Sequence, residues 1–349
     1  MVGELVPTPV DPQTAGEDFW KRYHEFRRVR QAESRPDDPP KRDADQEALM
    51  KRPDPFQVRE RFEISRHGRI VSWFAGYTNK QGSPEYESKK HLYDADIYVL
   101  SSHRRQGIGA SWLQLVVELM DRHGCTTVGF WAEEDSGHEF LKWVGAEPKL
   151  ANIESRVKLS EVDWPMLERW VAEGAVRSPK TRLEIYDGPL PEEMRADYAP
   201  QLSSMLNTIP FEALDHGEIV ITPERMREWY ARMEIGGEKL HTVMTREPDG
   251  VISGVTDTNW APYRPANIHQ QFTGVRPDAR GRGLGKWIKA AMLLHLRKVY
   301  PDAEYVVTDN AGSNAPMLKI NRMMGFKPYR TGTDYQITRD RLAERLRKR

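Results

Sequence analysis

The chain contains an internal repeat, and this repeat limits the available folds more than any other feature of the sequence. A short glycine motif occurs twice, as Gly107-Ile108-Gly109 and as Gly283-Leu284-Gly285, at an offset of 176 residues (283 − 107). Around both motifs the residue patterns run in the same order over about 50 residues: strand, glycine loop, long helix, strand, short helix and a helix-ending glycine. The sequence therefore predicts two copies of one α/β unit.

The length of 349 residues agrees with two units, since domains usually contain about 100–200 residues. We expect an N-terminal domain over residues 1–163 and a linker helix over 164–180, which ends beside a proline. A C-terminal domain is expected over 181–349.

The composition excludes several classes of protein. Lys and Arg number 52 and Asp and Glu also number 52, so no net field favours nucleic acid or an anionic membrane. Cys125 is the single cysteine, which rules out a disulfide framework and a thiolate metal cluster. No segment approaches the roughly 20 apolar residues of a membrane span, and residues 1–13 lack the pattern of a signal peptide. We expect a cytoplasmic protein with no nucleic-acid partner, no membrane partner and no metal ligand.

The chemistry suggested by the repeat lies in its two glycine loops. Residues 104–109 and 280–285 both fit Arg-x-x-Gly-x-Gly, between a strand and the first turn of a helix. Backbone N–H groups at a helix start carry partial positive charge and lack partners, so they can hold a pyrophosphate. Glycine lets the backbone approach such a ligand, and arginine adds charge-assisted hydrogen bonds. An ordinary tight turn is the alternative interpretation.

Two other phosphate-binding motifs do not fit both loops. A P-loop requires glycine at position 280, where this chain has Arg280. A dinucleotide fingerprint requires glycine or alanine three residues after its second glycine, where the two copies have Trp112 and Lys286.

The second loop and its surroundings resemble a known family. Residues 273–285 (TGVRPDARGRGLG) resemble the central coenzyme A motif of the GNAT N-acetyltransferases. Residues 314–317, followed by Gly325-Phe326, resemble the final motif of that family. The resemblance covers about residues 181–338 in the second copy and mainly 95–147 in the first. The doubled arrangement is similar to tandem members such as mycothiol synthase.

The resemblance implies a fold and a cofactor. The expected fold class is α/β (α+β), with two tandem GNAT-like domains, each a mixed, splayed β-sheet flanked by helices. The expected cofactor is acetyl-CoA, with its pantetheine arm along 272–275 and its pyrophosphate on 280–286. The implied cofactor-binding residues are Phe272, Thr273, Gly274, Val275, Arg280, Gly281, Arg282, Gly283, Leu284, Gly285, Lys286, Asn314 and Met317 in the second copy, and Val99, Arg104, Arg105, Gln106, Gly107, Ile108, Gly109 and Ala110 in the first.

Acetyl transfer to an amine requires a base, because a free alkylamine has a pKa of ~10.4 and must lose a proton. His269 and Asp309 are the candidates, with a sheet histidine and a turn residue as the alternative interpretations. The family often has an acidic tyrosine seven residues after the motif asparagine, where this chain has Asn321. The acid is therefore unassigned, although Tyr329 and Tyr335 are nearby in sequence.

Acceptor binding is expected at the charged loop that contains Glu212, Asp215, His216 and Glu218, because acidic groups attract a cationic amine. A solvated surface loop is the alternative. In the first copy Glu134 replaces the motif asparagine, so we expect a degenerate or supporting domain there and the chemistry in the second. The expected function is acetyl transfer from acetyl-CoA to a primary amine of a small molecule. A non-catalytic acyl-CoA-binding regulator and a nucleotide-binding protein are the alternatives.

Overall fold

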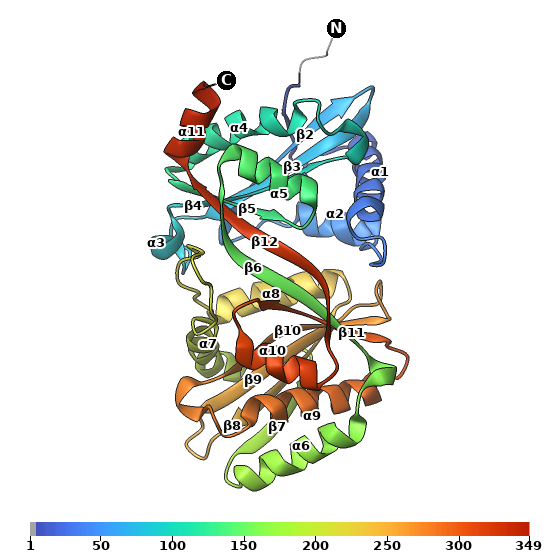
Figure 1. Cartoon of the computed structure of the whole chain (residues 1–349), viewed down its shortest axis with the longest axis vertical. Coiled ribbons are helices and arrows are strands. Elements are labelled where there is room, and N and C mark those ends of the chain that lie inside the picture. Colours follow the sequence, from blue (N-terminus) through green and yellow to red (C-terminus); the bar gives the residue numbers. More distant parts are fainter. Residues whose placement is uncertain (1–4, 349) are drawn as a thin grey trace. The chain divides into compact units, whose positions relative to one another are not determined.

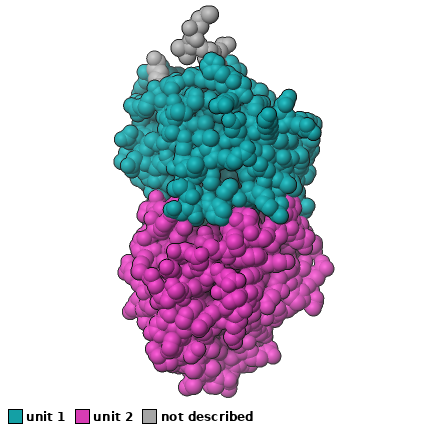
Figure 2. Space-filling view, turned by 90° about the vertical axis from the view of Figure 1, so that its right-hand side faces the viewer, with its two compact units in different colours: residues 1–151, 211–218, 332–349 teal, residues 152–210, 219–331 magenta. Residues whose placement is uncertain are grey.

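The computed structural model describes residues 5–348 and contains two compact units (Figure 1). Unit 1 consists of residues 1–151, 211–218 and 332–349, and unit 2 of residues 152–210 and 219–331 (Figure 2). The sequence placed residues 211–218 and 332–349 in the second domain, whereas in the structure both segments pack with the first. The two units are therefore not consecutive stretches of the chain.

Unit 1 is a sheet in the order β1-β2-β3-β4-β5-β12 with helices on both faces. Helix α4 and the C-terminal α11 pack on one face, and α1 packs on the other. The elements are β1 (Thr8–Pro9), α1 (Glu17–Ser34), α2 (Asp43–Lys51), β2 (Gln57–Arg66), β3 (Arg69–Asn79), α3 (Tyr86–Lys89), β4 (Leu92–Val99), α4 (Ile108–His123), β5 (Thr127–Ala132), α5 (Asp135–Val144), part of β12 (Lys327–Thr338) and α11 (Arg339–Arg347).

Unit 2 repeats this plan with the order β6-β11-β10-β9-β8-β7. Helices α9 and α6 cover one face, and α7 and α8 cover the other. The elements are part of β6 (Glu147–Lys158), α6 (Trp164–Arg177), β7 (Arg182–Asp187), α7 (Glu192–Leu206), α8 (Pro223–Ile235), β8 (Lys239–Arg246), β9 (Ile252–Trp260), β10 (Asn267–Val275), α9 (Leu284–Val299), β11 (Tyr305–Ala311), α10 (Ala315–Met323) and the start of β12.

The last strand of each sheet is contributed by the other half of the chain. In unit 1, residues 333–338 of β12 pair antiparallel with β5. In unit 2, residues 152–158 of β6 pair antiparallel with β11. Alternation of apolar residues determines which face of a strand is buried, but it does not determine the neighbour to which the strand hydrogen-bonds. This exchange explains why the compact units differ from the linear boundaries expected from the sequence.

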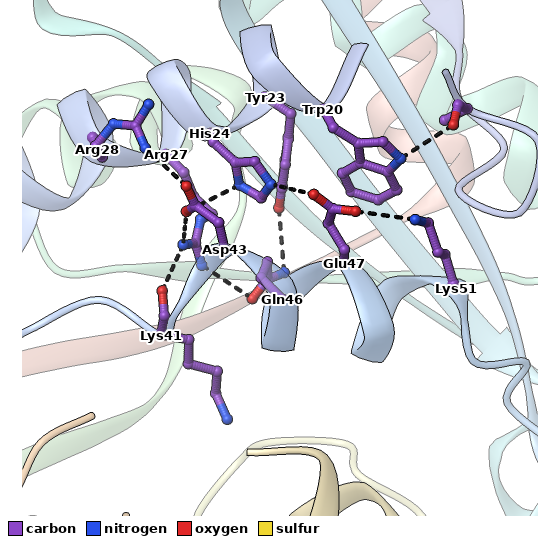
Figure 3. A network of polar contacts seen from close by, with 11 residues as sticks. Trp20, Tyr23, His24, Arg27, Arg28, Lys41, Asp43, Gln46, Glu47 and Lys51 are labelled. Atoms are coloured by element: carbon purple, nitrogen blue, oxygen red, sulfur yellow. Dashed lines mark hydrogen bonds and ion pairs between the residues drawn. The ribbon is translucent and has the colours of Figure 1, made fainter. Parts of the chain in front are cut away.

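Helices α1 and α2 of unit 1 are joined by a polar network (Figure 3). The buried His24 contacts Glu47 through Nε2 at 2.9 Å and Asp43 through Nδ1 at 3.2 Å. Arg27 donates to Asp43 at 3.0 Å and to the carbonyl of Lys41 at 2.7 Å. Helix α2 was not predicted from the sequence, because a helix of nine residues shows little apolar periodicity.

The expected fold class is confirmed: both units are mixed α/β (α+β) sheets flanked by helices, and in both the two central parallel strands separate. No helix among residues 5–348 is both long enough and apolar enough to span a membrane.

Candidate functional site

The separation of β10 from β11 in unit 2 defines the candidate site. The two strands are parallel and pair from Asn267 with Tyr305 to Gln270 with Thr308. Within the described chain this ladder ends there, while β10 continues along β9 to Val275 and β11 continues along β6 to Ala311. A register shift between Gln270 and Phe272 marks the point of separation. Main-chain groups on this edge of β10 can pair with an extended ligand, since backbone N–H and C=O groups need partners.

The four residues predicted to contact the pantetheine arm, Phe272–Val275, lie on this diverging part of β10. Thr273 is fixed by a hydrogen bond of 2.7 Å between its Oγ1 and that of Thr256. A Cβ at Gly274 would lie 2.3 Å from Cζ of Phe272, so a larger residue there would require the phenyl ring to move. The phenyl ring thus lies against the backbone of Gly274 and fixes this stretch of strand.

The glycine loop of unit 2 lies between β10 and α9. Gly281 and Gly283 have φ values of 82° and 83°, a left-handed conformation that side chains other than glycine rarely adopt. Gly283 is the N-cap residue of α9 and offers no side chain, so the first N–H groups of the helix point out of the loop without a side-chain cap. A Cβ at Gly281 would meet no atom within 4 Å. The loop therefore has the exposed backbone amides that an anion requires.

The cations around this loop have different roles. Arg280 donates to the carbonyl of Val275 at 3.2 Å and to Thr208 Oγ1 at 3.1 Å, so its partners here are neutral. Arg282 instead donates to Glu247 at 2.9 Å and to Thr181 Oγ1 at 2.6 Å.

Two further cations flank the start of α9. Lys286 lies over the ring of Trp170 at 4.8 Å. Arg177, at the end of α6, was not predicted from the sequence, yet its Nη1 lies 3.3 Å from the position of a Cβ at Gly283. Arg177 also donates to Glu173 through Nη2 at 3.2 Å, so its Nη1 is the side of the guanidinium that faces the loop.

The final motif places two asparagines at the beginning and in the last turns of α10. Asn314 is the N-cap residue and accepts a hydrogen bond of 3.4 Å from the backbone of Met317. Asn321 is buried, and its Nδ2 donates to Asn310 Oδ1 at 2.7 Å. Its own Oδ1 is buried with no hydrogen-bond partner among the described residues. A buried acceptor without a donor costs about 1–3 kcal/mol, so a ligand N–H at this position would be stabilising.

The two candidate bases lie on one face of the sheet. His269 is opposite Val307 in the parallel ladder, and Asp309 is two residues beyond Val307 on β11. Side chains two residues apart on a strand point to the same face. On that face Asp309 is paired in register with Glu154 of β6, which is buried and forms an ion pair of 2.8 Å with Arg156.

Unit 2 also contains two buried ionisable groups that sequence reasoning missed. Lys289 of α9 is 1% exposed and donates to Gln270 Oε1 at 3.2 Å. Burial lowers the pKa of Lys289 to about 7. Asp257 of β9 is 3% exposed, and burial raises its pKa to about 6, opposed by a hydrogen bond from Thr242. A lysine on the apolar face of α9 is the sequence signal that could have identified Lys289, whereas the polar sequence of β9 gives no such signal for Asp257.

Unit 1 has the same arrangement of diverging strands, glycine loop and helix, but a carboxylate lies at its loop. Strand β4 pairs with β5 only from Leu92 to Asp94, and Gly107, with φ 82°, is the N-cap residue of α4. Arg104 donates to the carbonyl of Val99 at 3.0 Å, as Arg280 does to Val275.

Three features distinguish the loop of unit 1 from that of unit 2. Arg104 also donates to Glu134 Oε2 at 2.6 Å, so its guanidinium is already paired with a carboxylate. Arg105, rather than a glycine, adopts the positive φ of 61°. Leu5 lies 3.9 Å from the position of a Cβ at Gly107.

The predicted acceptor loop packs with unit 1. Asp215 Oδ2 lies 2.8 Å from His91 Nε2, and the backbone of Asp215 exchanges hydrogen bonds with the side chain of Gln336. The N–H of Glu218 donates to Ser88 Oγ at 3.1 Å. The ring centroid of His216 lies 3.7 Å from that of Phe211, and Glu212 has a φ of 52°.

The two tyrosines near the final motif lie in different units. Tyr335 is buried in unit 1, where its hydroxyl lies 2.9 Å from His138 Nδ1. Tyr329 is in unit 2, where the guanidinium of Arg156 lies 3.7 Å from its ring centroid. Tyr335 therefore lies in the sheet of the first copy, opposite Phe130 of β5, although its sequence position is within the second copy.

Comparison with known proteins agrees with this geometry. Residues 19–145 match the model of the acetyltransferase (GNAT) family, so the match falls in the first copy and begins well before residue 95. The chain is 25% identical over 260 residues to the mycothiol acetyltransferase of Saccharomonospora viridis, covering 69% of this chain and 73% of the relative.

Two solved structures share the fold over nearly the whole chain. A tandem GNAT protein from the clavulanic acid biosynthesis pathway superposes with a TM-score of 0.74 at 20% identity, covering 96% of this chain and 99% of that one. A GCN5-related N-acetyltransferase from Sphaerobacter thermophilus gives a TM-score of 0.63 at 14% identity, covering 96% and 95%. Residues 19–145 thus match the acetyltransferase (GNAT) family, and the chain as a whole has the fold of a tandem GNAT protein.

Proposed function

We propose that unit 2 binds acetyl-CoA and transfers its acetyl group to a primary amine of a small molecule in the cytoplasm, and that unit 1 is a supporting domain. The observation that carries this proposal is the difference between the two loops. Among residues 5–348 the partners of Arg280 are neutral, whereas Arg104 pairs with Glu134. A carboxylate beside the phosphates would oppose binding, because like charges at short range repel.

The residues of unit 2 fit the cofactor. The main chain of Phe272–Val275 supports the pantetheine amides, and the N–H groups of residues 281–286 support the pyrophosphate. Arg280 and Arg177 add positive charge to this loop. The orphan Oδ1 of Asn321 accepts an N–H of the pantetheine arm, and Asn314 and Met317 fix the start of α10 beside it.

The side chains of unit 2 provide the proton transfers. Acetyl-CoA supplies the acetyl group as a thioester. His269 or Asp309 removes a proton from the amine, so that its lone pair is available for attack. The backbone N–H near Gly274 donates to the carbonyl oxygen as negative charge develops there. No tyrosine occupies the position of Asn321, so the thiolate leaves without a side-chain acid at this position.

The acidic loop predicted for amine recognition lies in unit 1 and is not part of the site of unit 2. Within that loop, Asp215 pairs with His91 of the same unit. A small-molecule acceptor is supported by the relative named as a mycothiol acetyltransferase.

Turnover with a panel of amines tests the proposal. The full chain is incubated with acetyl-CoA and primary amines, and released thiol and acetylated product are measured. We expect thiol release that depends on the acceptor, with none for a quaternary ammonium analogue, which cannot be acylated. CoA binding without acceptor-dependent release would instead favour the regulator, and displacement of CoA by ATP or NAD would favour a nucleotide-binding protein.

A further inference from the structure

Three side chains of unit 2 that play no part in acetyl transfer converge at one end of its sheet. Asp187 is the last residue of β7, His241 is near the start of β8, and His295 is in the last turns of α9. Asp187 Oδ1 lies 2.6 Å from His241 Nδ1 and 2.7 Å from His295 Nε2. Each of the three offers one ligand atom, and these atoms all lie within 4.8 Å of one another.

The donor set suits a divalent transition-metal ion. Two imidazoles and a carboxylate are typical ligands of zinc and of related ions, with metal–ligand distances of about 2.0–2.2 Å. Tetrahedral ligands at that distance are about 3.3 Å apart. The contacts of Asp187 would therefore have to lengthen by less than about 1 Å, and its side chain is 57% exposed and can move.

The surroundings orient the most buried ligand. His241 is 3% exposed, and its second nitrogen, Nε2, lies 2.8 Å from the hydroxyl of Tyr300. The ring of Tyr300 is itself stacked on Trp260 at 4.8 Å. Histidines that bind a metal usually donate their other N–H to such a partner, which fixes the tautomer and the orientation of the ring.

A hydrogen-bonded cluster without metal is the competing interpretation, and it differs in the position of a proton. Without metal, His241 Nδ1–H donates to Asp187 and the hydroxyl of Tyr300 donates to Nε2. With metal, the Nδ1 lone pair binds the ion and Nε2–H donates to the oxygen of Tyr300. The hydroxyl of Tyr300 is therefore a hydrogen-bond donor to His241 without metal and an acceptor from His241 with metal.

We propose that Asp187, His241 and His295 form a three-ligand site for a divalent ion of the zinc class, completed by water. The site would tie the edge strand β7 to β8 and α9. His295 is 11 residues beyond Leu284 (295 − 284), about 16 Å along the helix from the glycine loop. The proposal is thus independent of the acetyl-transfer site.

Metal binding to the full chain, first treated with a chelator, tests the proposal. Titration calorimetry with Zn²⁺ should give one ion per chain, and Co²⁺ should give the visible absorption of a tetrahedral complex. A zinc concentration about 100 times the Kd should raise the Tm by about 5–10 °C. The variants D187N and H295Q should lose binding, and Y300F should weaken it by about 10–100-fold. H91Q is the control. His91 and Asp215 form a pair that offers two ligand groups instead of three, so H91Q should bind Zn²⁺ as the wild type does.

Melting curves recorded in chelator establish that each variant is folded. Binding that is absent in the wild type, or equal in the wild type, D187N and H295Q, would overturn the proposal. Loss of binding in H91Q together with unchanged binding in H295Q would place the ion elsewhere and would also overturn it.

Discussion

Arg104 and Glu134 form an ion pair in unit 1, with Nη1 and Oε2 2.6 Å apart, at the position where unit 2 has Arg280 and Asn314. At this pair of positions the two copies thus differ by one carboxylate. Because both side chains are partly exposed, this pair contributes at most about 1 kcal/mol to folding. Its main consequence is that the negative charge of Glu134 opposes the binding of a diphosphate to the glycine loop of unit 1.

The first prediction removes this carboxylate. E134N should create a second, weaker site for CoA, because it frees Arg104 and places at the N-cap of α5 a residue that caps helices well. Calorimetry should show a change from about one CoA per chain to about two. The control E133Q alters the neighbouring carboxylate, which pairs with Arg35, and should stay at one. A stoichiometry of one for E134N would contradict the electrostatic explanation.

The second prediction concerns Arg177. R177A should raise the KM for acetyl-CoA by about 3–10-fold through the loss of a charge-assisted contact to phosphate, with little change in kcat. Steady-state kinetics at varied acetyl-CoA measures both values. Arg169 is an exposed arginine on the same helix, so R169A is the matched control and should behave as the wild type. Equal KM values for the two variants would remove Arg177 from the site.

The third prediction identifies the base. One of the variants H269Q and D309N should lower kcat by about 10²–10⁴-fold and abolish the rise of the rate with pH, while the other should change kcat by less than about tenfold. The pH–rate profile at saturating acetyl-CoA, with unfolding midpoints for each variant, is the measurement. Wild-type profiles in both variants would exclude both residues as the base.

The fourth prediction follows from the buried Lys289, whose pKa is lowered by burial from its ordinary 10.5 to about 7. Between these values the unfolded chain binds the proton and the folded chain does not. The free energy of unfolding of the wild type should therefore rise with pH through this window. K289M should be more stable than the wild type near neutral pH, and the difference should shrink by about 2 kcal/mol from about pH 7.5 to about 9.5.

Urea unfolding at both pH values measures this difference. K298M, which replaces an exposed lysine in the last turn of the same helix, is the control and should follow the wild type. A constant difference between K289M and the wild type would show that Lys289 is charged in the folded chain.

Local structure around the glycine loop was predictable from the sequence. The order of strand, glycine loop and long helix predicted around residues 280–285 is the order of β10, the loop and α9, because apolar spacing and glycines mark these elements in the sequence. The strand exchange was not predictable, since nothing in the local residue pattern of 327–338 specifies pairing with β5. The loop 211–218 likewise packs with unit 1 through contacts to residues distant in sequence, such as Ser88 and Gln336.

The candidate site was predictable in part. The backbone of 272–275 and 280–286 follows from local motifs, and the structure places these residues on the diverging strand and at the start of α9. Arg177 precedes Gly283 by 106 residues (283 − 177), and no local pattern brings them together. The ion pair between Arg282 and Glu247 also joins segments distant in sequence, so it could not be predicted from a local motif.

The central claim is that exposed amides at the start of α9, and not those at the start of α4, bind the diphosphate of the cofactor. Calorimetric titration of CoA into G283D and G107D tests it most directly. Both glycines have nearly the same positive φ, of 83° and 82°, so the two variants carry the same backbone strain and the same added charge. G283D should weaken binding by about 100-fold or more, while G107D should bind as the wild type does. Wild-type affinity in G283D, or loss of binding in G107D alone, would contradict the account.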